Sequence, residues 1–271
     1  MKTLLIHAKQ HFAQYRNPFT FYDAQTFPLP PKSTIIGMLQ NATNKYYDES
    51  FWDLLVSVHG GFESVFWNYS NIIKAQKIQI CKENSNYKLF VEQREGIFPL
   101  YGGIKNSQRT PIKMQELYNG HLWIFIRAKD NFKYWNELKD SLEKPKKILL
   151  LGRSEDLIFI DKVIEAIESK ETIEEKNIWI QYPTYLKNTI PIKNKKYPVY
   201  FIPTEVKFTN NGIAVKSKTE INKEKTNRDT EFQPVIYAGT NSAMYFKENI
   251  KIEIFEENQK LFNIPINYGW I

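Results

Sequence analysis

Prolines stand directly in front of a segment with helical periodicity, and they limit how the chain can fold there. In FPLPPKSTIIGMLQNA (residues 27–42), the prolines hold the backbone extended, because each fixes φ and disfavours the helical region for the residue before it. The apolar residues of the following segment recur at helical spacing: Ile35, Ile36, Leu39 and Ala42. The pattern predicts a helix that begins near Ser33 or Thr34, with one of these hydroxyl groups as its N-terminal cap.

Two interpretations of this helix start remain open. The free N–H groups beside Lys32, Ser33 and Thr34 would suit a phosphate, because unpaired donors and the helix dipole both favour an anion. The alternative is an ordinary capped helix whose apolar face packs in the core.

Length and composition indicate a folded protein without a metal or cofactor. The 271 residues and the 42% hydrophobic content allow two modest domains or one large one. No apolar run approaches the roughly 18 residues of a membrane span, and the N-terminal MKTLLIHAKQ becomes charged too soon for a signal peptide. We therefore expect a cytoplasmic protein without membrane association. A single cysteine and scattered histidines predict no internal disulfide, no structural metal and no cofactor.

Basic charge is concentrated in one segment. The chain carries a net charge of +7, and residues 187–228 hold ten Lys or Arg against three acidic residues, an excess as large as that of the whole chain. Aromatic residues make up 15% of the sequence, and basic residues interleaved with aromatics suit single-stranded nucleic acid, where bases stack while phosphates pair. A generally lysine-rich composition remains the alternative explanation.

The order of predicted elements indicates an α+β fold. The remaining patterns predict, along the chain, a strand at 2–9, a short helical piece capped by Asp48 and ended by the glycines at 60–61, strands within 62–80, a strand at 121–128, a helix at 132–142 and a strand at 148–151. With the first helix, the order is strand, helix, strand, insertion, strand, helix, strand. This order is typical of the ferredoxin-like fold of RNA-recognition modules.

We predict two domains. A ferredoxin-like domain spans residues 1–170 and carries a long insertion at about 78–120, and loops of that length usually have a structure or function of their own. After Glu174 the chain changes to short strand-like runs separated by Pro and Gly, which predicts a β-rich C-terminal domain at 171–271.

The inserted segment REGIFPLYGGIKNSQRTPIKMQ (residues 94–115) contains candidate nucleic-acid contacts. Its glycines and prolines allow sharp bends and close backbone approach, and all charges after Glu95 are basic. The candidate contacts are Tyr101, Lys105, Gln108, Arg109, Thr110, Lys113 and Gln115. Arg109 could bind a phosphate through two hydrogen bonds, and Tyr101 could stack on a base. A polar surface hairpin without a function is the alternative.

Three segments together resemble a known family. FPLPPKSTIIGMLQNA resembles the N-terminal proline-serine-glycine signature of the fifth CRISPR-associated (Cas) protein family, a subunit of type I Cascade complexes in the RAMP superfamily. YGGIKNSQRTPIKMQ (residues 101–115) resembles the thumb of that family, and LGRSEDLIFID (residues 151–161) is similar to its LGRSE loop. The resemblance covers about the first 165 residues, while the remainder is similar only in being β-rich and in its Tyr-Gly-Trp segment at 268–270. Subtype I-B looks most similar, and a type III relative remains an alternative.

The resemblance implies a non-enzymatic cap on guide RNA that serves antiviral defence. Members of the family hold the 5′ handle of the CRISPR RNA, contact the first Cascade backbone subunit and anchor the Cascade large subunit, so that target DNA is contacted indirectly. By this resemblance, Lys32, Ser33, Thr34, Arg153 and Ser154 would face the RNA backbone. The thumb would lie against the handle through Arg109, Thr110 and Lys113.

A different function remains open. Some members of the I-C subtype are metal-independent endoribonucleases that process CRISPR repeat RNA with Tyr, Lys and His side chains, since this cleavage needs only a general base and a general acid. The sequence does not place any two histidines of the chain together: His7, His11, His59 and His121. A metabolic enzyme is disfavoured, because no Gly-rich nucleotide loop, paired-carboxylate motif or nucleophile elbow is visible.

Overall fold

The computed structural model describes residues 1–20, 23–73, 109–165, 167–193, 197–210, 212–221, 226–239 and 242–271. Within these ranges the chain is mostly β-sheet with few helices. The helices are α1 (Lys32–Thr43), α2 (Trp135–Glu143) and the short 3₁₀ turns η1 (Glu49–Asp53) and η2 (Lys218–Glu220). None of these helices is long and apolar enough to cross a membrane.

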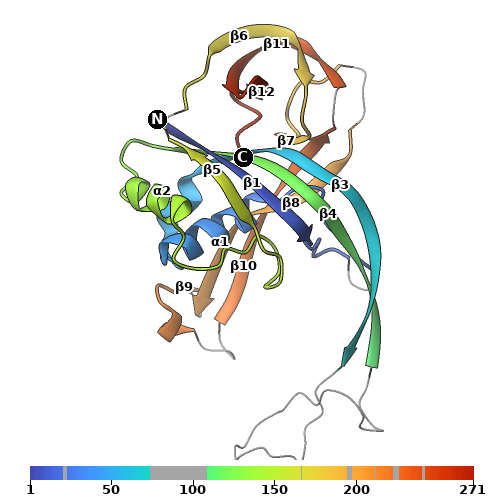
Figure 1. Cartoon of the computed structure of the whole chain (residues 1–271), viewed down its shortest axis with the longest axis vertical. Coiled ribbons are helices and arrows are strands. Elements are labelled where there is room, and N and C mark those ends of the chain that lie inside the picture. The colour runs from blue at the N-terminus through green and yellow to red at the C-terminus, as the bar shows by residue number, and fades with distance from the viewer. Residues whose placement is uncertain are drawn as a thin grey trace, which may run out of the picture.

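The strands form two sheets (Figure 1). The main sheet has the order β5-β1-β4-β3-β7-β10-β8-β9, and β2 pairs with β4 beside this path; the smaller sheet has the order β12-β11-β6. The strands of the first half are β1 (Lys2–Ala13), β2 (Asp23–Ala24), β3 (Leu55–Ile73), β4 (Arg109–Ala128) and β5 (Phe159–Ile164). The others are β6 (Glu171–Ile180), β7 (Thr184–Lys187), β8 (Val199–Asn210), β9 (Ile213–Ala214), β10 (Thr226–Ala238), β11 (Ser242–Glu257) and β12 (Lys260–Pro265).

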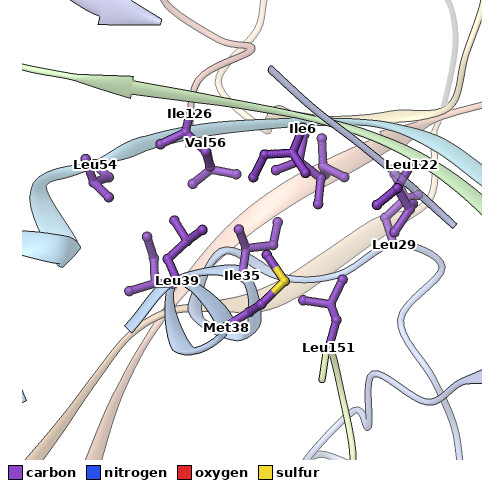
Figure 2. Close-up of a cluster of buried hydrophobic side chains, with 14 of the residues drawn as sticks. Ile6, Leu29, Ile35, Met38, Leu39, Leu54, Val56, Leu122, Ile126 and Leu151 are labelled. Carbon is purple, nitrogen blue, oxygen red and sulfur yellow. The ribbon is translucent and has the colours of Figure 1, made fainter. Parts of the chain in front are cut away.

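The main sheet lies between α1 and the smaller sheet. Side chains of a strand alternate between its two faces, so successive residues of β1 enter different cores. Ile6 packs with α1, including Ile35, on one face (Figure 2), whereas Leu5 packs with Trp123 and Phe262 on the other. The predicted apolar stripe of α1 is confirmed, because three of its members are buried and Ala42 is partly buried.

The predicted cap of α1 is wrong. The helix begins at Lys32 and its N-cap is Pro31, which is extended and makes no side-chain hydrogen bond. Ser33 and Thr34 therefore lie inside the first turn, one and two residues beyond the helix start. In contrast, the cap predicted at Asp48 is confirmed, because its carboxylate accepts a hydrogen bond from the Ser50 N–H at 3.0 Å and precedes η1.

The glycines at 60–61 do not end an element, contrary to the prediction. Both lie inside β3, which runs without interruption of register from Leu55 to Ile73 beside β4. Gly60 has φ of +124°, and a Cβ there would stand 2.0 Å from the backbone oxygen of His121. A glycine is therefore required at this point by close contact between strands rather than by a turn.

Two further boundaries differ from the prediction. The insertion expected at 78–120 ends earlier, because residues 109–120 belong to β4 and pair with β3. The strand expected at 148–151 is instead a loop with one isolated bridge from Leu150 to Leu157, and the chain forms β5 after it. The helix expected at 132–142 is present as α2.

The two halves of the chain share the main sheet. β7, β10, β8 and β9 continue the sheet beyond β3, where the connection is the single pair His59 and Thr184. The last residue, Ile271, exchanges two backbone hydrogen bonds with Val56 of β3, at 2.9 and 3.1 Å. Whether the chain divides into domains at 170 and 171 stays a prediction.

Candidate nucleic-acid interface

The proline segment before α1 is held in place by a buried tyrosine. The hydroxyl group of Tyr185 accepts a hydrogen bond from the Leu29 N–H at 3.1 Å and donates one to the Leu29 carbonyl oxygen at 2.9 Å. Phe27 and Leu29 are buried in the main core. The direction of α1 is therefore determined by packing as well as by the prolines themselves.

The predicted site residues at the start of α1 divide into two kinds. The Lys32 ammonium group donates a hydrogen bond to the carbonyl oxygen of Trp52 at 3.0 Å, and burial lowers the pKa of Lys32. Ser33 and Thr34 are half-buried, and neither hydroxyl group makes a hydrogen bond to any part of the chain that the structure describes. Lys32 is thus engaged by its own chain, whereas the two hydroxyl groups remain available.

A cavity of about 360 Å³ lies beside the two hydroxyl groups. It brings together α1 from Ser33 to Asn41, the turn and η1 that follow this helix, the loop before β5, and strands β8, β9 and β10. Its lining includes Ser33, Thr34, Tyr47, Gly152, Phe208 and Arg228. The structure thus places the start of α1 beside the loop that resembles LGRSE.

That loop is tied to the sheet through Arg153. Its guanidinium group lies 2.7 Å from Glu116 of β4 and 2.9 Å from Asp156, whose carboxylate also accepts the Gln14 N–H at 3.0 Å. Burial disfavours the charge of Arg153, but its hydrogen bonds to Asp156 and Glu116 outweigh this effect and raise its pKa. Asp156 is only 1% exposed. The charge of Arg153 is therefore balanced within the chain, and its contact with RNA stays a prediction, as does that of the exposed Ser154.

Gln115 also has partners in its own chain. Its side-chain oxygen accepts a hydrogen bond from the Thr26 N–H at 3.1 Å, and its backbone oxygen accepts one from the Gln14 amide at 3.0 Å. These bonds hold the segment before α1 against β4. Gln115 therefore stabilises the base of the ribbon formed by β3 and β4.

The ribbon curves away from the rest of the chain (Figure 1) and carries three of the other predicted thumb residues. Lys113 is exposed and lies opposite Tyr69, whereas Arg109 and Thr110 begin β4 opposite Ile73 and Ile72. The side chains of Arg109 and Thr110 are outside the description. Tyr101, Lys105 and Gln108 lie outside the described residues altogether.

One face of the ribbon is exposed and aromatic. Val65, Trp67 and Tyr69 alternate along β3 with exposures of 53%, 51% and 62%, and Lys113 stands across from the last of them. Aromatic surfaces beside a cation suit single-stranded nucleic acid. The sequence prediction did not single out these aromatics, although their spacing of two residues in a strand was a usable signal.

Histidines and a lysine lie on neighbouring strands of the main sheet, where the Lys9 ammonium group pairs with Asp161 at 2.8 Å. Lys9 of β1 stands directly opposite His121 of β4, and the ring of His7 stacks on Trp123 with centroids 5.0 Å apart. Burial lowers the pKa of His7 and lowers that of His59 to about 3. In the described part of the chain, no three His, Cys, Asp or Glu residues are grouped so that they could hold a metal ion. The expected absence of a structural metal stays a prediction.

Several solved structures are similar to this chain. A chain of a "CRISPR RNA-guided surveillance complex" shares 13% identity over 89% of this chain and 91% of its own length, with a TM-score of 0.51, which shows a common fold. A CRISPR protein from Archaeoglobus fulgidus shares 10% identity over 97% of this chain and 99% of its own length, with a TM-score of 0.39. A chain of a type III-B Cmr-beta complex bound to cognate target RNA shares 11% identity over 91% of this chain and 86% of its own length, also with a TM-score of 0.39.

Sequence comparison identifies the family. No curated protein matches the chain. Residues 3–241 match the family described as CRISPR-associated protein (Cas_Cas5), so the match includes α1, the ribbon, the loop before β5 and both strands of the β8–β10 pair. The chain therefore belongs to the CRISPR-associated protein (Cas_Cas5) family.

Proposed function

We propose that this protein is a guide-RNA-binding subunit of a CRISPR surveillance complex. The observation that carries the proposal is the family match over residues 3–241. The common fold with a chain of an RNA-guided surveillance complex supports it. The exposed aromatic face of the ribbon, with Lys113 beside it, supplies a surface of the required chemistry.

In this proposal the protein holds the 5′ handle of the guide RNA. It contacts the first Cascade backbone subunit and anchors the Cascade large subunit in a type I complex, of subtype I-B, that serves antiviral defence. We assign it a ferredoxin-like N-terminal domain, which the strand order β5-β1-β4-β3 with α1 and α2 supports. Its role is non-catalytic, because holding the handle requires contacts rather than chemistry.

Reconstitution with two guide RNAs tests this role. The complex is assembled with RNA that carries either the native or a scrambled 5′ handle, using the wild-type protein and Arg109→Ala/Lys113→Ala. The wild type should prefer the native handle, and the double variant should fold but lose the handle end of the RNA. Lys176→Ala/Lys251→Ala removes the same charge from exposed positions on the smaller sheet and serves as the control.

Two results would count against the proposal. Equal retention of native and scrambled handles by the wild type would show that the protein does not recognise the handle. Equal retention by wild type and Arg109→Ala/Lys113→Ala at every salt concentration would show that the ribbon is not the RNA contact.

A second candidate function is metal-independent cleavage of repeat RNA. The observation that favours it is the register position of Lys9 opposite His121, because RNA cleavage needs one group that accepts a proton and one that donates it; in the structure the Lys9 ammonium group pairs with Asp161 at 2.8 Å. Labelled repeat RNA is incubated with the protein in excess chelator. Our proposal expects intact RNA, whereas cleavage that disappears in Lys9→Ala/His121→Ala would establish the nuclease instead.

A further inference from the structure

Gly37 stands in the middle of α1, where a glycine needs an explanation. Glycine in a helix interior is less favourable than alanine, because it has more backbone freedom to lose. No other group lies within 4 Å of the position that a Cβ of Gly37 would occupy. Packing within the described chain therefore leaves room for a side chain, and Gly37 instead leaves the helix backbone open toward the cavity that it lines.

Aromatic side chains form another wall of this cavity. The rings of Tyr47 and Phe208 lie edge to face with centroids 6.0 Å apart, and Trp52 also lines the space. Phe208 of β8 stands directly opposite Arg228 of β10, so both side chains are on the same face of the sheet. Aromatic rings and a guanidinium plane are the surfaces on which unpaired RNA bases stack.

Polar groups around the cavity fit the rest of a nucleotide. Arg228 is exposed and makes no ion pair with a described residue, whereas Lys207 is held by Glu205 at 2.7 Å. The free hydroxyl groups of Ser33 and Thr34 lie at the positive end of α1. Glu49 lines the same space and can accept a hydrogen bond from the amino group of a base.

From these features we propose that the cavity holds one unpaired nucleotide of an RNA strand. The base lies among the aromatic rings, the sugar lies against Gly37, and the phosphate lies near Arg228 and the start of α1. The inference rests on the proposed function, because it requires that the protein bind RNA. The volume of about 360 Å³ is near the lower end of ligand sites, which suits one nucleotide and leaves the rest of the strand outside.

A partner's apolar side chain is a poorer match for this cavity. Such a side chain would leave the hydroxyl groups of Ser33 and Thr34 and the charge of Arg228 without partners as they lost water. A nucleotide satisfies these groups and uses the aromatic wall as well.

Filling the cavity from the helix tests the proposal. Gly37→Leu places a side chain in the space proposed for the ligand and replaces glycine by a good helix former. Binding is measured by fluorescence anisotropy with a single-stranded guide RNA and with a series in which one nucleotide at a time is abasic. The wild type should lose about 10-fold in affinity at one position of the series, as expected for one lost stacked base.

The Gly37→Leu variant should lose as much RNA affinity as the wild type loses at the abasic position. Gly37→Leu should bind the intact RNA about 10-fold more weakly and should no longer respond to the abasic position, while its melting temperature is unchanged or higher. Gly239→Leu is the control, since Gly239 also has open space around it and lies outside the cavity. If Gly37→Leu does not fold, Phe208→Ala should show the same loss of response, and Arg228→Ala should bind the intact RNA more weakly while still responding to the abasic position.

The outcomes separate this inference from the proposed function. RNA binding by the wild type with no sensitive position, and with equal affinity in Gly37→Leu, would overturn the cavity site and leave the proposed function standing. Failure of the wild type to bind RNA would overturn both. Nucleoside monophosphates that bind as tightly as the RNA would overturn the inference by assigning the cavity to free nucleotides.

Discussion

Nη1 of Arg153 lies 2.7 Å from Oε1 of Glu116, an ion pair that joins the loop before β5 to the base of the ribbon. The same guanidinium group bonds Asp156, which in turn accepts a hydrogen bond from the N–H of Gln14, the residue after β1. A residue expected to bind RNA is thus part of an internal network. Any loss of RNA binding on its removal must be separated from a loss of stability.

We predict that Arg153→Ala destabilises the protein substantially. Removing the guanidinium group leaves the buried carboxylate of Asp156 and that of Glu116 without their cation, which costs roughly 2–4 kcal/mol. Urea unfolding followed by circular dichroism measures the change. The matched control is Arg228→Ala, which removes an exposed arginine and should change stability by less than about 0.5 kcal/mol. An Arg153→Ala variant that is as stable as the wild type but deficient in RNA binding would contradict this prediction and would indicate that Arg153 contacts the RNA directly.

We predict that Ser33→Ala/Thr34→Ala leaves the stability of the protein within about 0.5 kcal/mol of the wild type. The reason is that neither hydroxyl group caps α1, and neither has a hydrogen-bond partner within the described ranges. Thermal melting measures the effect, and RNA affinity is measured on the same samples. A loss of 1 kcal/mol or more, as about expected for a broken cap, would show that the hydroxyl groups stabilise the helix after all.

We predict that acid weakens the fold through His59. Burial lowers the pKa of His59 to about 3, below the roughly 6.5 of an unfolded chain, so the unfolded state binds the extra proton between these values. This contribution is fully present above pH 6.5 and is lost as the pH falls, by about 2 kcal/mol between pH 7 and pH 5. His7, whose pKa burial also lowers, acts in the same direction.

Unfolding free energies measured from pH 7 to pH 5 check the prediction. His59→Gln removes the titrating group and should show a shallower dependence on pH, whatever its stability at pH 7. A slope equal to that of the wild type would mean that His59 is not the source of the acid sensitivity.

We predict that Lys113→Ala lowers the salt dependence of RNA binding. Each cation that neutralises a phosphate of a single strand contributes about 0.7 to the slope of log affinity against log salt concentration. The variant should therefore have a slope smaller in magnitude by about 0.7, measured by anisotropy over a series of salt concentrations. Lys176→Ala should keep the wild-type slope, because Lys176 lies on the smaller sheet. An unchanged slope for Lys113→Ala would remove it from the RNA contact.

Local pattern was sufficient for the elements whose signals lie within a few residues. The stripe of α1, the cap at Asp48 and the strand that ends at Ala128 follow from side-chain spacing, turn chemistry and hydrophobic runs. The glycines at 60–61 misled the prediction, because a Gly-Gly pair usually marks a turn whereas here a strand neighbour comes too close for a side chain.

The sequence by itself determined the family signature, the stiff approach to α1 and the basic character of the thumb. Only the tertiary structure decided which charged groups are free. It pairs Arg153 with carboxylates and leaves Arg228 exposed, although both arginines have polar residues beside them in the sequence. It also brings Phe208 and Arg228 to the cavity beside Gly37. Strand pairing and core packing make such contacts between residues far apart in the chain, and the local periodicity of the sequence does not predict them.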